Sequence, residues 1–157
     1  MRLEEYYKID DYNEKYNFFY KFTFNLDYSI VTLDEIWCLL DISFALFRHY
    51  FEKNEFQNSE YISEQCEKML DHYLNTSNWD NVCICNDKID FILDVVCFVY
   101  ELSYKYEQKA QILRRILDTE IIDKHLRQRA LEEVKSMVSF SDLFTEKDIN
   151  SFVDSCK

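Results

Sequence analysis

Cysteine and histidine are the residue types through which this chain could hold a metal ion. Cys66, His72, Cys83 and Cys85 follow one another with the spacing C-x5-H-x10-C-x-C. Structural zinc sites usually contain C-x2-4-C and H-x3-5-H pairs, and this spacing has neither. Cys83 and Cys85 also lack the two-residue spacer of thioredoxin-like redox motifs. The sequence therefore predicts packed or exposed thiols and no metal site.

Catalytic constellations are equally hard to assemble from these residue types. The three histidines, His49, His72 and His125, belong to no HExxH or Glu-x-x-His motif. The chain contains no glycine and no proline, which excludes glycine-rich phosphate loops and the GxSxG nucleophile elbow. Carboxylates are so abundant that any choice of an acid–base pair is arbitrary. We therefore expect no enzyme, no catalytic residue, no cofactor and no small-molecule substrate.

Acidic residues, in contrast, are regularly spaced on two predicted helices. Spacings of three, four or seven residues place each set on one helix face, and the first set lies opposite an apolar stripe. The sets are Glu60, Glu64, Glu67 and Asp71 on the first helix, and Asp87, Asp90, Asp94 and Glu101 on the second. Each face is either a solvated surface or a docking surface for a cationic protein.

The dipeptide Trp79–Asp80 lies in the asparagine-rich and serine-rich segment 75–86, between the two acidic helices. An aromatic side chain ringed by carboxylates suits an interface that neutralises arginine and lysine and excludes water. The alternative is that Trp79 packs under the loop as a lid on the core. For a docking surface, the predicted partner-binding residues are Glu60, Glu64, Glu67, Asp71, Trp79, Asp80, Asp87, Asp90 and Asp94.

The net charge of −12 is unevenly distributed along the chain. Residues 1–104 contain 20 acidic and 8 basic residues, whereas residues 105–157 contain 10 of each. Such a protein repels nucleic acid and anionic membranes and attracts a basic protein. The basic stretch in the last third favours a self-complementary surface, or an arm that pairs with the acidic helices, over an RNA site. It comprises Lys105, Lys109, Arg114, Arg115, Lys124, Arg127, Arg129 and Lys135.

The N-terminal residues MRLEEYYKIDDY have no apolar run and no small-residue cleavage site, so they do not form a secretory signal. No apolar stretch approaches the roughly 18 residues that span a membrane. Six cysteines without a secretion signal indicate reduced, mostly buried thiols. We expect a cytoplasmic protein.

Helices must position all of these residues, because tight turns between strands depend on glycine and proline. Asparagine takes the place of glycine at helix ends. A break is expected within residues 103–107, and no repeat with a period of 33–47 residues is evident. We predict one all-α domain over residues 1–157, an irregular bundle or short solenoid-like stack of six to seven helices without a sheet. Helix starts are expected near Asp11, at the capping box Thr32–Glu35, at Ser59, Asp87 and Thr119, and at a second capping box, Thr145–Asp148.

In overall character, the chain resembles the small acidic cytosolic immunity proteins that neutralise bacterial toxins, including those of contact-dependent growth inhibition systems. The features behind the resemblance are the two acidic faces and Trp79 between them. It implies tight binding to a basic nuclease toxin domain whose active site is occluded. It carries no motif, and so it transfers no residue roles.

Two other functions would also depend on the binding of another protein to a surface of this helical chain. A phage or viral inhibitor could present carboxylates as mimics of DNA phosphates to a restriction or CRISPR nuclease, although the neutral last third of the chain counts against it. A viral helical bundle that modulates host signalling would need a hydrophobic groove. The favoured hypothesis is a stoichiometric protein-binding inhibitor, because opposite charge raises association rates and the chain lacks a catalytic motif.

Overall fold

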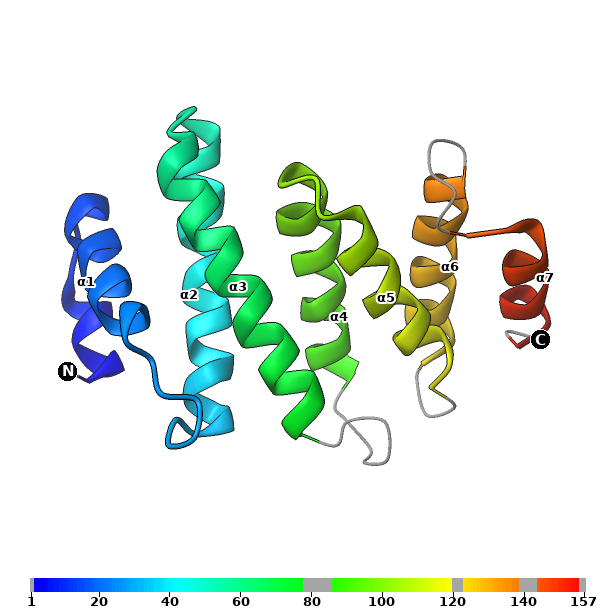
Figure 1. Ribbon diagram of the computed structural model, residues 1–157, viewed down its shortest axis with the longest axis horizontal. Helices are drawn as coiled ribbons and strands as arrows, with labels where there is room; N and C mark the ends of the chain where they lie inside the picture. Colours follow the sequence, from blue (N-terminus) through cyan, green and yellow to red (C-terminus); the bar gives the residue numbers. More distant parts are fainter. Residues whose placement is uncertain (1, 78–85, 120–122, 139–143, 156–157) are drawn as a thin grey trace. The chain divides into compact units, whose positions relative to one another are not determined.

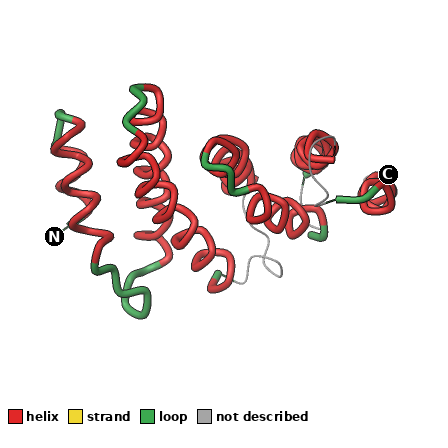
Figure 2. The backbone as a smooth tube through the Cα atoms, turned by 45° about the horizontal axis from the view of Figure 1, so that its top comes forward, coloured by secondary structure: helices red, strands yellow, loops and turns green. Residues whose placement is uncertain are grey.

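The computed structural model describes residues 2–77, 86–119, 123–138 and 144–155, and within them the protein is all α-helical, as predicted (Figure 1). The tube view shows helices and connecting loops and no strand in the described part of the chain (Figure 2). The chain divides into two compact units, Met1–Asn78 and Trp79–Lys157, which are described separately below. The single domain expected from the sequence stays a prediction. None of the described helices is long and apolar enough to cross a membrane.

The first unit is built around a helical hairpin. A short 3-10 helix, Leu3–Lys8, leads into α1 (Tyr12–Phe24), which is followed by α2 (Leu33–Glu52) and α3 (Phe56–Thr76). Asp11 caps α1, because its carboxylate accepts the backbone N–H of Glu14 at 3.1 Å. At Thr32 the predicted capping box is present in full. The helices α2 and α3 pack against each other and bury the core of this unit.

The second unit contains α4 (Asn86–Val95), which continues into a π-helical turn, Val96–Tyr100. The predicted break follows at Ser103–Lys105, and α5 (Tyr106–Leu117), α6 (Lys124–Val138) and α7 (Glu146–Ser155) complete the unit. The second capping box is confirmed, since Thr145 and Asp148 exchange backbone-to-side-chain hydrogen bonds of 2.9 and 3.2 Å.

Two predicted helix starts are wrong. Ser59 lies inside α3, where its hydroxyl donates to the Phe56 carbonyl, because the turn after α2 leads directly into the next helix. Thr119 follows the end of α5 instead of starting α6: its hydroxyl donates to the Arg115 carbonyl at 3.0 Å. The start of α6 is marked by Asp123, whose carboxylate accepts the backbone N–H of His125 at 2.8 Å.

The hairpin α2–α3 and the segment α4–α5 have the same turn, with an offset of 50 residues. In the first turn, the backbone amide of Glu55 donates to the carbonyl of Tyr50 at 2.9 Å. In the second, the backbone amide of Lys105 donates to the carbonyl of Tyr100 at 2.8 Å. Both turns are Schellman motifs, in which one residue takes a left-handed conformation. These residues are Asn54 (φ 59°) and Tyr104 (φ 60°).

Nine buried positions of the first hairpin are also buried in the second at this offset, although others differ, such as the buried Leu40 and the exposed Asp90. The repeat was not evident from the sequence, because few of its paired residues are identical. The buried pairs are Leu39 and Ile89, Ile42 and Ile92, Ser43 and Leu93, Leu46 and Val96, Tyr50 and Tyr100, Ser59 and Lys109, Ile62 and Ile112, Ser63 and Leu113, and Cys66 and Ile116.

This matched pair of turns predicts opposite effects of substitution. A left-handed conformation costs a non-glycine residue about 1–2 kcal/mol, and asparagine tolerates it better than tyrosine. Tyr104 is 80% exposed, so Tyr104→Asn is expected to raise the free energy of unfolding by about 1 kcal/mol. Asn54→Ala is expected to lower it by a similar amount. Urea denaturation measures both, and a destabilised Tyr104→Asn protein would contradict the prediction.

Candidate functional site

The acidic face predicted on α3 is present in the structure. The side chains of Glu60, Glu64 and Asp71 are exposed and that of Glu67 is half-buried. The opposite stripe is buried and consists of Ile62, Cys66, Met69 and Tyr73. The prediction of an acidic face opposite an apolar face on this helix is therefore confirmed. We call the four acidic residues the α3 acidic row.

The acidic residues of α4 have a different environment, because a cation from α6 is bound to two of them. The Arg129 guanidinium contacts the carboxylate of Asp90 at 2.7 Å and that of Asp94 at 2.6 Å. These carboxylates raise the pKa of Arg129, against the opposing effect of burial. Asp87 is exposed at the start of the helix. Trp79 and Asp80, the other predicted contact residues, lie outside the described residues, as do Cys83 and Cys85.

Part of the basic stretch contacts helices of its own unit: Arg129 and Lys109 pair with acids of the second predicted acidic helix, whereas pairing of the stretch with the α3 acidic row stays a prediction. Arg129 binds α4, and the buried Lys109 ammonium lies 3.0 Å from Glu133 of α6. Arg127 is also buried and donates to the backbone carbonyls of Leu117 and Thr119, at the end of α5. These cations stabilise contacts between helices within the second unit.

Cys97, in the π-helical turn, adjoins this charge network. Burial raises the pKa of its thiol to about 12, and the nearby charge of Glu133 adds to the shift, whereas Lys109 and Arg129 oppose it. A nucleophilic cysteine needs the opposite environment, one that stabilises the thiolate. The surroundings of Cys97 therefore favour an inert thiol.

Alkylation tests this assignment. Because the thiolate is the reactive species, Cys97 of the native protein is expected to react with iodoacetamide at pH 8 on the order of a hundredfold more slowly than in urea. Mass spectrometry of the peptide that contains Cys97 measures the two rates. Glu133→Gln should raise the native rate, since it removes one of the charges that raise the pKa. Equal rates in native and unfolded protein would contradict the assignment.

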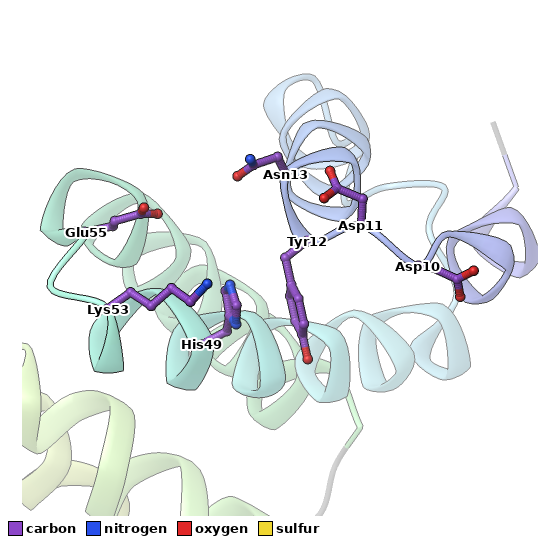
Figure 3. A pocket seen from close by; sticks show the side chains of 7 residues that line it. All are labelled: Asp10, Asp11, Tyr12, Asn13, His49, Lys53 and Glu55. Atoms are coloured by element: carbon purple, nitrogen blue, oxygen red, sulfur yellow. The ribbon is translucent and has the colours of Figure 1, made fainter.

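A small open pocket of about 220 Å³ lies between the start of α1 and the end of α2 (Figure 3). The imidazole of His49 stacks on the ring of Tyr12, with 3.6 Å between ring centroids. Burial and the charge of Lys53 lower the pKa of His49, and Glu55 and Glu52 partly offset them. The Asp11 carboxylate is bound to the backbone of α1, and Asp10 lies away from His49 in Figure 3. The pocket can accept a small polar group at the edge of the imidazole, but these contacts do not align an acid–base pair with it.

An aromatic cluster on α1 and α3 was missed in the sequence. Tyr20 and Phe24 are 39% and 62% exposed. The ring of Tyr20 lies 5.4 Å from that of Phe24 and 4.9 Å from that of Tyr61, between centroids. The signal that could have revealed it is the four-residue spacing of Tyr16, Tyr20 and Phe24.

No set of three His, Cys, Asp or Glu side chains in the described part of the chain could hold a metal ion. No family model, no curated protein and no solved structure matches the chain.

Proposed function

We propose that the protein is a stoichiometric inhibitor that binds a basic protein through the α3 acidic row, in the manner of a toxin-immunity protein. The observation that carries the proposal comes from the two matched hairpins. The positions of Glu60, Glu64 and Glu67 correspond, 50 residues later, to Ala110, Arg114 and Leu117. Ala110 and Leu117 are buried in the second hairpin, whereas Arg114 is accessible to solvent like Glu64. The second hairpin thus forms with a cation in the place of Glu64, so the shared turn and buried pairs do not require this carboxylate.

The row also carries an electrostatic cost that a partner would remove. Like charges at i, i+4 destabilise a helix by about 0.2–0.5 kcal/mol per pair, and Glu60 and Glu64 are both exposed at this spacing. Basic side chains of a partner would replace this repulsion with attraction. They would also steer the encounter, which raises association rates at low salt.

Nuclease domains suit this surface, because proteins that bind nucleic acid present lysine and arginine to phosphates. The acidic residues of α4 are less available to a partner than the α3 acidic row. Asp90 and Asp94 already bind Arg129, so a partner would have to compete with this arginine for them. We therefore centre the interface on α3, and Trp79, Asp80 and Asp87 stay proposed partner contacts.

The identity of the partner is tested by capture from cells of the source organism, washed at two salt concentrations. A basic toxin retained at equal stoichiometry, especially one encoded by the neighbouring gene, supports immunity. Capture of a restriction or CRISPR nuclease encoded elsewhere supports the DNA-mimic alternative instead. No specific partner at either salt concentration contradicts the proposal.

The surface is tested by charge reversal with the captured partner. Glu64→Lys is expected to slow association by about tenfold at low salt and to flatten its salt dependence, because it weakens the attractive field. Stopped-flow fluorescence measures the rate. The matched control is Glu132→Lys, which makes the same change of charge at an exposed position of α6. Equal rates for the two variants would contradict the proposed surface.

A further inference from the structure

The aromatic cluster of Tyr16, Tyr20, Phe24 and Tyr61 borders the α3 acidic row. Tyr61 comes from α3 itself, one residue after Glu60 and three residues before Glu64. Its hydroxyl lies 2.8 Å from the hydroxyl of Thr23, which fixes the ring between the two helices. Burial raises the pKa of Tyr61, the hydrogen bond with Thr23 opposes this shift, and the charges of Tyr20 and Glu64 add smaller increases.

The rings form a continuous surface. Tyr20 contacts both Phe24 and Tyr61, and Tyr16 lies 6.3 Å from each of Tyr20 and Tyr61. Lys15 lies over the rings of Tyr12 and Tyr6, nearer the start of α1. In the part of the chain that the structure describes, no cation lies over Tyr20, Phe24 or Tyr61.

In the second unit, aromatic rings and a carboxylate together surround an arginine side chain. The Arg114 guanidinium lies 5.0 Å from the ring centre of Phe144 and 5.8 Å from that of Phe152. The same guanidinium contacts the carboxylate of Asp148 at 3.4 Å. Two rings and one carboxylate thus hold one arginine, because a planar guanidinium stacks on aromatic faces while its edge donates to oxygen.

We propose that the aromatic cluster and the adjoining Glu60 and Glu64 bind an arginine side chain of the basic partner. The cluster supplies rings and the row supplies carboxylates, which is the combination that surrounds Arg114. Arginine is favoured over lysine because lysine is a compact, strongly hydrated charge that gains less from ring faces. This inference rests on the proposed function and adds the side chain that the surface selects.

The test compares an oligoarginine peptide with an oligolysine peptide of the same length, by calorimetry with the full-length protein. The wild-type protein is expected to bind oligoarginine about two- to fivefold more tightly, as expected for contacts between cations and exposed rings. The variant Tyr20→Ala/Phe24→Ala should bind both peptides equally, and Tyr20→Phe should keep the preference. The control is Ile30→Ala, because Ile30 is an exposed apolar residue outside the cluster.

The outcomes separate the inference from the proposed function. If the wild-type protein binds both peptides equally, or if Tyr20→Ala/Phe24→Ala keeps the preference, the inference is overturned while the acidic surface stands. If Glu64→Gln weakens both peptides alike and the preference follows the aromatic residues, both are supported. If neither peptide binds, the inference is wrong, and partner capture then decides the proposed function independently. Circular dichroism establishes that each variant is folded.

Discussion

Replacing Glu133 with alanine is expected to lower the free energy of unfolding by about 3 kcal/mol, because it leaves a buried cation without its closest partner. The Lys109 ammonium is only 1% exposed and lies 3.0 Å from Glu133; Glu101, its other neighbour, is at 3.8 Å. A charge buried in this way has no access to water, so its interaction with Glu133 compensates for the loss of solvation.

The reverse substitution should be much milder. Lys109→Met removes the buried charge and keeps the aliphatic volume, while Glu133 is 30% exposed and can be solvated. Replacing a buried ion with an apolar side chain of similar size is often neutral, and we expect a loss below about 1 kcal/mol. Urea denaturation measures both variants. Glu132→Ala is the control, because its side chain is exposed on the same helix. A larger loss for Lys109→Met than for Glu133→Ala would contradict this assignment.

Helix starts with a complete local signal were predictable from the sequence. The box Thr32–Glu35 and the box Thr145–Asp148 contain both of their hydrogen-bonding partners within four residues, so no distant contact is needed to form them. Asn54 illustrates the same point at a helix end. Asparagine tolerates the left-handed conformation, and the structure places it there.

Ser59 and Thr119 show where local reasoning fails. Both residue types favour helix starts, but they also donate to a carbonyl within a helix when the chain around them is already helical. Whether Ser59 begins a helix depends on the turn before it, in which Glu55 ends one motif and precedes α3. Tyr104 is a stronger case, because its residue type opposes the left-handed conformation that the matched turn imposes.

The candidate surface was only partly predictable for a related reason. Helical periodicity placed the α3 acidic row correctly, since one helix determines its own faces. Which acids bind cations depends on the packing of separate helices, and the capture of Asp90 and Asp94 by Arg129 is such a contact. The juxtaposition of Tyr20 and Tyr61 likewise requires α1 and α3 to lie together. The spacing of residues in the sequence therefore identifies the faces of a helix, whereas contacts between helices determine which side chains on a face stay available to a partner.

Arg127 provides the second large effect expected in this protein. Its guanidinium is buried and donates to the carbonyls of Leu117 and Thr119, the latter just beyond the end of α5, where carbonyls have no partner within the helix. Hydrogen bonds to a charged group contribute about 1.5–3 kcal/mol, and buried acceptors left without donors add to the cost. Arg127→Met is therefore expected to lower the free energy of unfolding by about 3 kcal/mol.

The geometry of the guanidinium makes this prediction specific. Arg127→Lys should recover only part of the loss, because an ammonium on a shorter stem lacks the planar fork that reaches two carbonyls at once. Lys124→Met, an exposed position of the same helix, should change stability by less than about 0.5 kcal/mol. Urea denaturation gives the three values, and hydrogen exchange at the end of α5 should accelerate in Arg127→Met alone. If Arg127→Met matched Lys124→Met, the two carbonyl bonds would contribute nothing to stability, and the role assigned to Arg127 at the end of α5 would be wrong.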